Sequence, residues 1–93
     1  MKKFVLLAHG PMEHTPEFRD AHMRWWSSMA GNVTDSGNPL FNGRDVSADG
    51  SVTEVTDDPA AGYSIIEAGS LEDAIALLDG CPMDMWVYEA MPM

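Results

Sequence analysis

Residues 62–82 read Gly-Tyr-Ser-Ile-Ile-Glu-Ala-Gly-Ser-Leu-Glu-Asp-Ala-Ile-Ala-Leu-Leu-Asp-Gly-Cys-Pro. The β-formers from Tyr63 to Ala68 predict a buried strand. Ser70, with Asp73 three residues later, is typical of the capping box that begins a helix. Apolar residues then recur at helical spacing until a glycine and a proline end the helix. This stretch therefore predicts a strand followed directly by a short amphipathic helix.

A strand is also predicted at the start of the chain, from Lys3 to His9. Both of its faces are mostly apolar, which is typical of a strand that is covered on both sides. A chain of 93 residues has helices enough to cover only one face of a sheet. The other face is expected to meet a partner sheet, which suggests a homodimer.

The first helix is predicted to begin at Thr15, because a threonine N-cap precedes Pro16 in the first turn. It should run to about Ala30, with Gly31 as its C-terminal stop. One stripe of this helix collects apolar and aromatic side chains, with Trp26 beside it: Phe18, Ala21, His22, Trp25 and Met29.

The remaining elements are shorter. Val33 to Ser36 is a weak strand, and Arg44 to Thr56 is predicted to form a hairpin that turns at Asp49-Gly50. The segment from Trp86 to Ala90 alternates as a last strand. The order of elements predicts one α+β domain over residues 1–93, in which two helices lie on one face of an antiparallel sheet.

Composition excludes several classes of function. The chain carries 15 acidic and 5 basic residues, a net charge of −10, which would repel nucleic acid and anionic membranes. No apolar run is long enough to span a bilayer or to form the core of a signal peptide. The single cysteine, Cys81, suits a reducing compartment. A cytoplasmic protein without nucleic-acid or membrane partners is expected.

His22 is the main candidate for chemistry, because it lies within the aromatic stripe of the first helix, where burial and neighbouring groups would tune its pKa. The alternative is an ordinary buried histidine. Trp26, at the edge of the stripe, suits a ligand cleft or an interface. His9 and His14 could converge with His22 on a metal, but their spacing matches no standard metal motif, so no metal or cofactor is expected.

Several segments together resemble the YCII-related proteins, close to their DGPF-containing branch. They are Lys3-Phe-Val-Leu-Leu, the Trp25-Trp26 helix, Val33-Thr-Asp-Ser-Gly-Asn-Pro-Leu40, Asp49-Gly50, Gly62-Tyr-Ser-Ile-Ile-Glu-Ala68, Ser70-Leu-Glu-Asp-Ala74 and Cys81-Pro82. The resemblance implies a ferredoxin-like fold whose sheets pair face to face as a dimeric α+β barrel. It also implies a histidine on the first helix and an aspartate just before the proline that follows the second helix.

His22 occupies the position of that family histidine. Cys81 stands where the aspartate is expected, and the nearest acid is Asp79. Related barrels bind small aromatic or lactone-like molecules, which makes isomerase-like, lyase-like or dehalogenase-like chemistry the classes to consider.

The first hypothesis is a homodimer that binds a small apolar or aromatic molecule between helix and sheet. His22 would be its acid or base, Asp35 or Asp79 the orienting carboxylate, and His9 and Trp26 further ligand contacts. The alternative is a non-catalytic dimerisation or interaction module, whose acidic hairpin from Asp45 to Glu54 meets a basic partner. A closed apolar cleft beside His22 would favour the first hypothesis, and a filled interior would favour the second.

Overall fold

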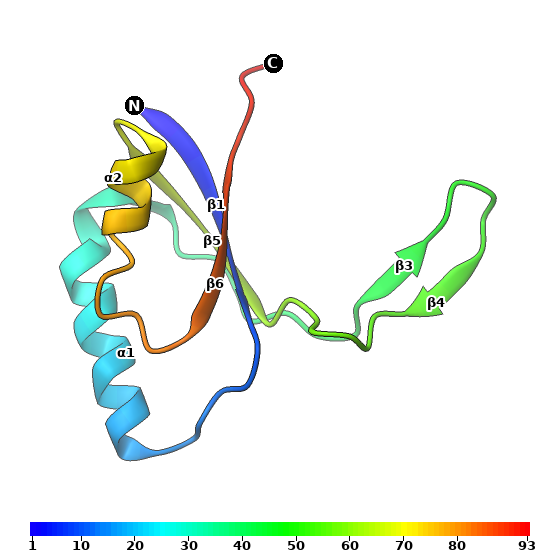
Figure 1. The fold of residues 1–93 in the computed structure, drawn as a ribbon, viewed down its shortest axis with the longest axis horizontal. Helices are drawn as coiled ribbons and strands as arrows, with labels where there is room; N and C mark the ends of the chain where they lie inside the picture. Colours follow the sequence, from blue (N-terminus) through cyan, green and yellow to red (C-terminus); the bar gives the residue numbers. More distant parts are fainter.

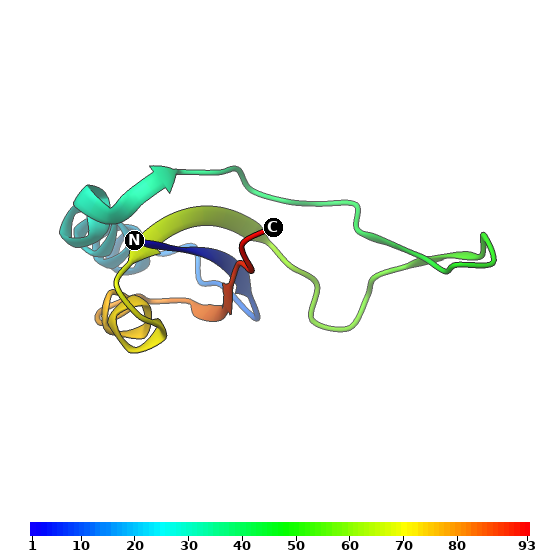
Figure 2. The ribbon, with the colours of Figure 1, turned by 90° about the horizontal axis from the view of Figure 1, so that it is seen from above.

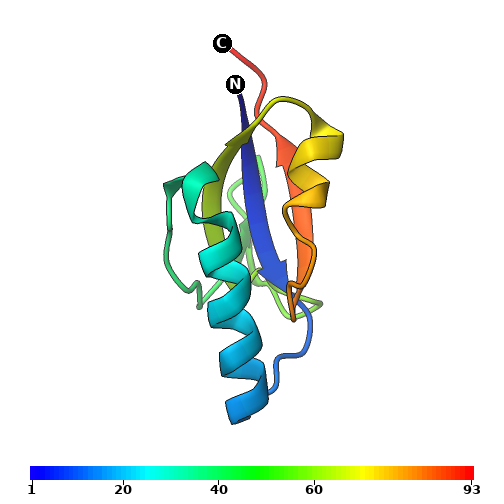
Figure 3. The ribbon, with the colours of Figure 1, turned by 90° about the vertical axis from the view of Figure 1, so that its left-hand side faces the viewer.

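The computed structural model describes residues 1–93, which form a four-stranded antiparallel sheet with the strand order β2-β5-β1-β6. The strands are β1 (Lys2–His9), β2 (Val33–Asp35), β5 (Gly62–Ala68) and β6 (Asp84–Glu89). Two helices, α1 (Pro16–Met29) and α2 (Leu71–Ala76), lie on the same face of this sheet (Figure 3). This is the ferredoxin-like α+β arrangement predicted from the sequence.

The strand β1 is central because both of its edges are paired. Leu6 lies opposite Ser64 of β5 and opposite Val87 of β6, and the same antiparallel registers continue along the strand. The backbone of β1 is therefore satisfied on both sides. The two edge strands of the sheet are β2, which is short and irregular, and β6.

Both predicted helix caps are confirmed. The Thr15 hydroxyl accepts the N–H of Phe18, and the Ser70 hydroxyl accepts the N–H of Asp73. The predicted helix ends are less accurate. Beyond Met29 the chain tightens into the 3-10 helix η1 (Ala30–Asn32), so Gly31 lies within a turn. The helix α2 ends at Ala76, after which tight turns replace α-helical bonding until Gly80 adopts a left-handed conformation.

The core lies between the helices and the covered face of the sheet. Its buried members come from β1, α1, β5 and α2, and they are Phe4, Leu6, Trp25, Met29, Ile66, Ala68 and Ala74. The indole N–H of Trp25 donates to the carbonyl of Leu77 at 3.0 Å, which ties α1 to the end of α2. The helix α2 covers one end of the sheet and α1 passes along its length (Figure 3).

The other face of the sheet has no helix against it. Leu7 of β1 lies between Tyr63 of β5 and Trp86 of β6, and the pattern repeats with Val5 between its neighbours Ile65 and Tyr88. Except for Tyr88, which is exposed, these side chains are half-buried. The doubly apolar character of β1 thus leaves one apolar face open in the single chain.

The predicted hairpin is confirmed as β3 (Arg44–Val46) paired with β4 (Val52–Glu54). It forms the end of an arm, residues 40–61, that extends from the sheet on the side away from the helices (Figures 1 and 2). The arm carries exposed apolar side chains, including Phe41, Val46 and Val52.

Neither α1 nor α2 has the length and apolar character that a membrane crossing requires.

A close backbone contact joins the segment after β2 to the start of β5. Gly37 has a φ of +72°, and a Cβ placed on it would lie 1.7 Å from the carbonyl oxygen of Tyr63. Asn38 follows at once, and its carbonyl accepts the N–H of Tyr63 at 3.1 Å. Only glycine fits this approach, because any side chain would collide with backbone that cannot move aside.

Gly37→Ala should therefore destabilise the protein by more than about 3 kcal/mol in urea unfolding, because the strained φ and the clash act together. Gly80→Ala is the matched control, since Gly80 has a φ of +82° but nothing within 4 Å of an added Cβ. The control should cost only the backbone strain, about 1–2 kcal/mol. Equal losses in the two variants would show that the contact with Tyr63 has no energetic role.

Candidate functional site

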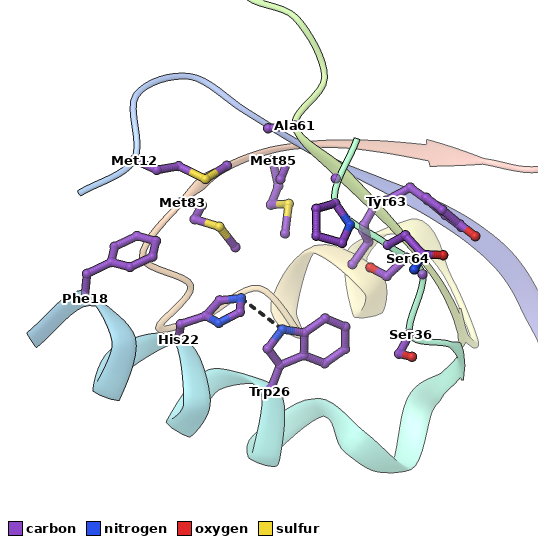
Figure 4. A pocket seen from close by; sticks show the side chains of 16 residues that line it. Met12, Phe18, His22, Trp26, Ser36, Ala61, Tyr63, Ser64, Met83 and Met85 are labelled. Carbon is purple, nitrogen blue, oxygen red and sulfur yellow. Dashed lines mark hydrogen bonds between the residues drawn. The ribbon is translucent and has the colours of Figure 1, made fainter. Parts of the chain in front are cut away.

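A cavity of about 360 Å³ lies between α1 and the covered face of the sheet. Its lining is mostly apolar, with aromatic rings from α1 on one side and thioether side chains opposite (Figure 4). These side chains are Met12, Phe18, Trp26, Met83 and Met85. A space of this size and character suits one small ring-containing molecule.

The helix α1 supplies three successive members of the lining at intervals of four residues. Phe18, His22 and Trp26 stand one above the other on a single face of the helix. The His22 ring lies nearly parallel to the Phe18 ring, with 6.1 Å between the centroids, and perpendicular to the Trp26 ring at 6.2 Å. His22 is thus held between two aromatic side chains of its own helix.

His22 makes one hydrogen bond within the chain. The indole N–H of Trp26 donates to Nε2 of His22 at 3.0 Å (Figure 4). Partial burial against the apolar lining lowers the pKa of His22 below its ordinary value of 6.5, because desolvation disfavours the imidazolium. Above pH 6.5 the neutral form of the ring therefore predominates.

The strands β1 and β5 contribute further residues to the lining of the cavity. Leu6 and Ala8 come from β1, and Ser64 from β5 is only 3% exposed. Ser36, Asn38 and other residues of the segment after β2 complete the wall. No Asp, Glu, Lys or Arg lines the cavity, so its polar groups are an imidazole, an indole N–H, hydroxyls, an amide and backbone.

The two aspartates predicted beside His22 lie elsewhere. Asp35 is exposed at the end of β2, where its carboxylate accepts the N–H of Gly37 at 2.9 Å. Asp79 is exposed in the turn after α2. The structure does not bring either carboxylate into the lining of the cavity. Their role as the carboxylate that orients His22 stays a prediction.

His9 is separated from His22 by the sheet. Its ring stacks on Trp86 with 3.7 Å between centroids, on the face opposite the helices. Its Nδ1 lies 2.8 Å from Asp58, whose other carboxylate oxygen accepts the N–H of Gly10 at 2.8 Å. Asp58 itself has a left-handed φ of 48°. This pair ties the base of the arm to the end of β1.

The three histidines do not converge, since His14 is exposed in the loop before α1. No group of three or more His, Cys, Asp or Glu side chains is close enough to hold a metal ion. Cys81 is half-buried and its thiol donates to the carbonyl of Met83. Burial raises the pKa of that thiol, so it has no thiolate character at neutral pH.

The sequence placed His22 in the apolar stripe of α1 and Trp26 at the edge of that stripe, and the structure brings both into the cavity lining. Most of the opposite wall was missed. Met83 lies just before β6 and Met85 lies within it, two residues apart on one face, so the period of two in that segment could have pointed to them. No local signal identifies Met12, which lies in the loop before α1. The pairing of Asp58 with His9 could not be predicted either, because the two residues are 49 positions apart in the chain.

A similar fold is found in 5-chloro-2-hydroxyhydroquinone dehydrochlorinase (TftG) from Burkholderia phenoliruptrix, whose structure contains 2,5-dihydroxybenzoquinone. The TM-score is 0.51 at 12% sequence identity, and the match covers 98% of this chain and 94% of that one. At this identity the likeness shows the fold alone, and it confirms the α+β class. No protein-family model and no curated protein matches the chain, so membership of the YCII-related family stays a prediction.

Proposed function

We propose that the protein binds a small apolar or aromatic molecule in the cavity between α1 and the sheet, with His22 as the polar group that meets it. The observation that carries the proposal is the cavity itself, about 360 Å³ of space bounded by aromatic and thioether side chains. Three methionines and a phenylalanine in this lining leave a gap that a ring can fill.

The fold neighbour supports the same class of ligand. TftG, with a similar fold, holds a six-membered quinone ring. Catalysis of the dehalogenase, isomerase or lyase type would use His22 as its acid or base, without a metal or other cofactor. The non-catalytic interaction module is the second candidate, and the cavity beside His22 weighs against it because such a module needs no internal space.

We also propose that the protein acts as a homodimer through the open sheet face. Val5, Leu7, Ile65 and Trp86 would leave an apolar surface in contact with water in a single chain. The arm extends on this same side and, as an isolated two-stranded ribbon, is too small to be stable alone (Figure 2). A second copy of the chain would pack against both the open sheet face and the arm.

Titration with toluene tests the cavity directly. The expected result is a set of amide chemical-shift changes in NMR spectra centred on Ala8 and Ser64 together with the indole N–H of Trp26. Ser64→Leu should abolish them, because the added side chain fills the space, whereas Ala76→Leu on the exposed side of α2 should not. Changes centred on the open sheet face, or equal behaviour of the two variants, would contradict the proposal.

His22→Ala should cost only about 1 kcal/mol of unfolding free energy, because His22 is half-buried and makes a single hydrogen bond. Met29→Ala, at a fully buried position on the same helix, should cost about 2–5 kcal/mol. Urea unfolding of both variants gives the comparison. A loss at His22 as large as that at Met29 would mark the histidine as a core residue without a site role.

The dimer predicts a mass about twice the chain mass of 10.2 kDa in sedimentation equilibrium. Leu7→Lys should give a monomer, since it places an ammonium group in the middle of the open face. Met23→Lys makes the same kind of change on the exposed side of α1 and should leave the mass unchanged. A monomeric native protein would overturn the dimer.

A further inference from the structure

The hydrogen bond between Trp26 and His22 determines where the imidazole carries its proton. An indole N–H can only donate, so Nε2 of His22 must present a lone pair to it at 3.0 Å. A neutral imidazole has one N–H, and it must then be on Nδ1. The two residues are four apart on α1, so the helix itself holds donor and acceptor together.

The same bond opposes protonation of His22. An imidazolium carries hydrogen on both nitrogens and could not accept from the indole. The Glu, Asp, Lys and Arg side chains of the protein all lie outside the cavity lining, so no carboxylate there compensates a positive ring. The cavity thus contains a neutral ring whose Nδ1–H has no partner within the chain.

We propose that Trp26 is a positioning residue that holds His22 as the Nδ1–H tautomer, and that the cavity takes an uncharged aromatic ligand whose ketone or quinone oxygen accepts this N–H. The inference rests on the proposed function and narrows its ligand class. His22 then polarises a carbonyl as a neutral donor, a role that neutral histidines fill in other enzymes, and it does not remove a proton through Nε2.

The charges around the cavity favour a neutral ligand. A carboxylate ligand would lose its hydration against a lining without Lys or Arg, in a chain of net charge −10. An ammonium ligand would find no carboxylate in the lining. A pure hydrocarbon would fill the space but leave the Nδ1–H unpaired, which costs free energy once water is displaced.

The tautomer can be read without any ligand. In ¹⁵N-labelled full-length protein above pH 6.5, the ring nitrogens of His22 should show a protonated Nδ1 and an unprotonated Nε2, with His22→Asn used to assign the signals. Trp26→Phe keeps an aromatic ring but removes the donor, and it should shift the proton toward Nε2. Trp86→Phe, on the opposite sheet face, should leave the His22 signals unchanged. A protonated Nε2 in the native protein overturns the inference.

Three probes of nearly equal shape test the ligand class: acetophenone, α-methylstyrene, which lacks the oxygen acceptor, and benzoate, which is anionic. Acetophenone should bind about two- to tenfold more tightly than α-methylstyrene, the range expected for one hydrogen bond. Benzoate should bind more weakly than both. His22→Asn retains a donor near the position of Nδ1 and should keep the preference, while His22→Leu should abolish it.

These measurements distinguish the donor role of His22 from ligand binding in the cavity. Equal binding of acetophenone and α-methylstyrene in the native protein would overturn the donor role while leaving the cavity as an apolar binding site. If none of the three probes binds, both the proposed function and the proposed ligand class are overturned. The NMR spectrum of His22 then still shows whether the tautomer is the one proposed.

Discussion

The central strand β1 is apolar on both faces, and the chain has helices for only one of them. Phe4, Leu6 and Ala8 are buried on the face that carries α1 and α2, whereas Val5 and Leu7 alternate with them and lie on the opposite face. Burial of apolar surface is the main favourable term in folding. In the single chain, the apolar surface on one face of β1 is left without a covering layer. The rest of the architecture depends on how each of these two faces is covered.

On the covered face, the two helices pack unequally. The short α2 stands over one end of the sheet, and its single buried residue is Ala74. The longer α1 continues past it, and along that extension the side chains above the sheet are Phe18, His22 and Trp26. The buried residues of α1 are Trp25 and Met29, both in its second half. The cavity lies beside Phe18, His22 and Trp26 of the same helix.

On the open face, His9, Asp58 and Trp86 form a fixed group at the foot of the arm. The left-handed backbone of Asp58 is tolerated because its carboxylate is bound at both oxygens. Together with the Gly37 contact to Tyr63, this group fixes where both connections of the arm leave the sheet. The arm is therefore rooted firmly, while its hairpin of exposed valines stands apart from the body of the sheet.

The caps at Thr15 and Ser70, the hairpin and the ferredoxin-like class were predictable because each depends on near neighbours in the chain or on a simple period of apolar residues. The helix ends were less predictable, since the chain after Met29 continues as a 3-10 turn that contains Gly31. His22 and Trp26 were found together for the same local reason, because four residues make one helical turn.

What the sequence by itself determined is the set of elements, their order and the aromatic face of α1, all of which follow from local spacing. Only the tertiary structure decided that Asp35 and Asp79 stay outside the cavity, that His9 lies behind the sheet, and that methionines form the wall opposite His22. These outcomes depend on strand pairing between distant segments, and one residue of register moves a side chain from one face of a sheet to the other.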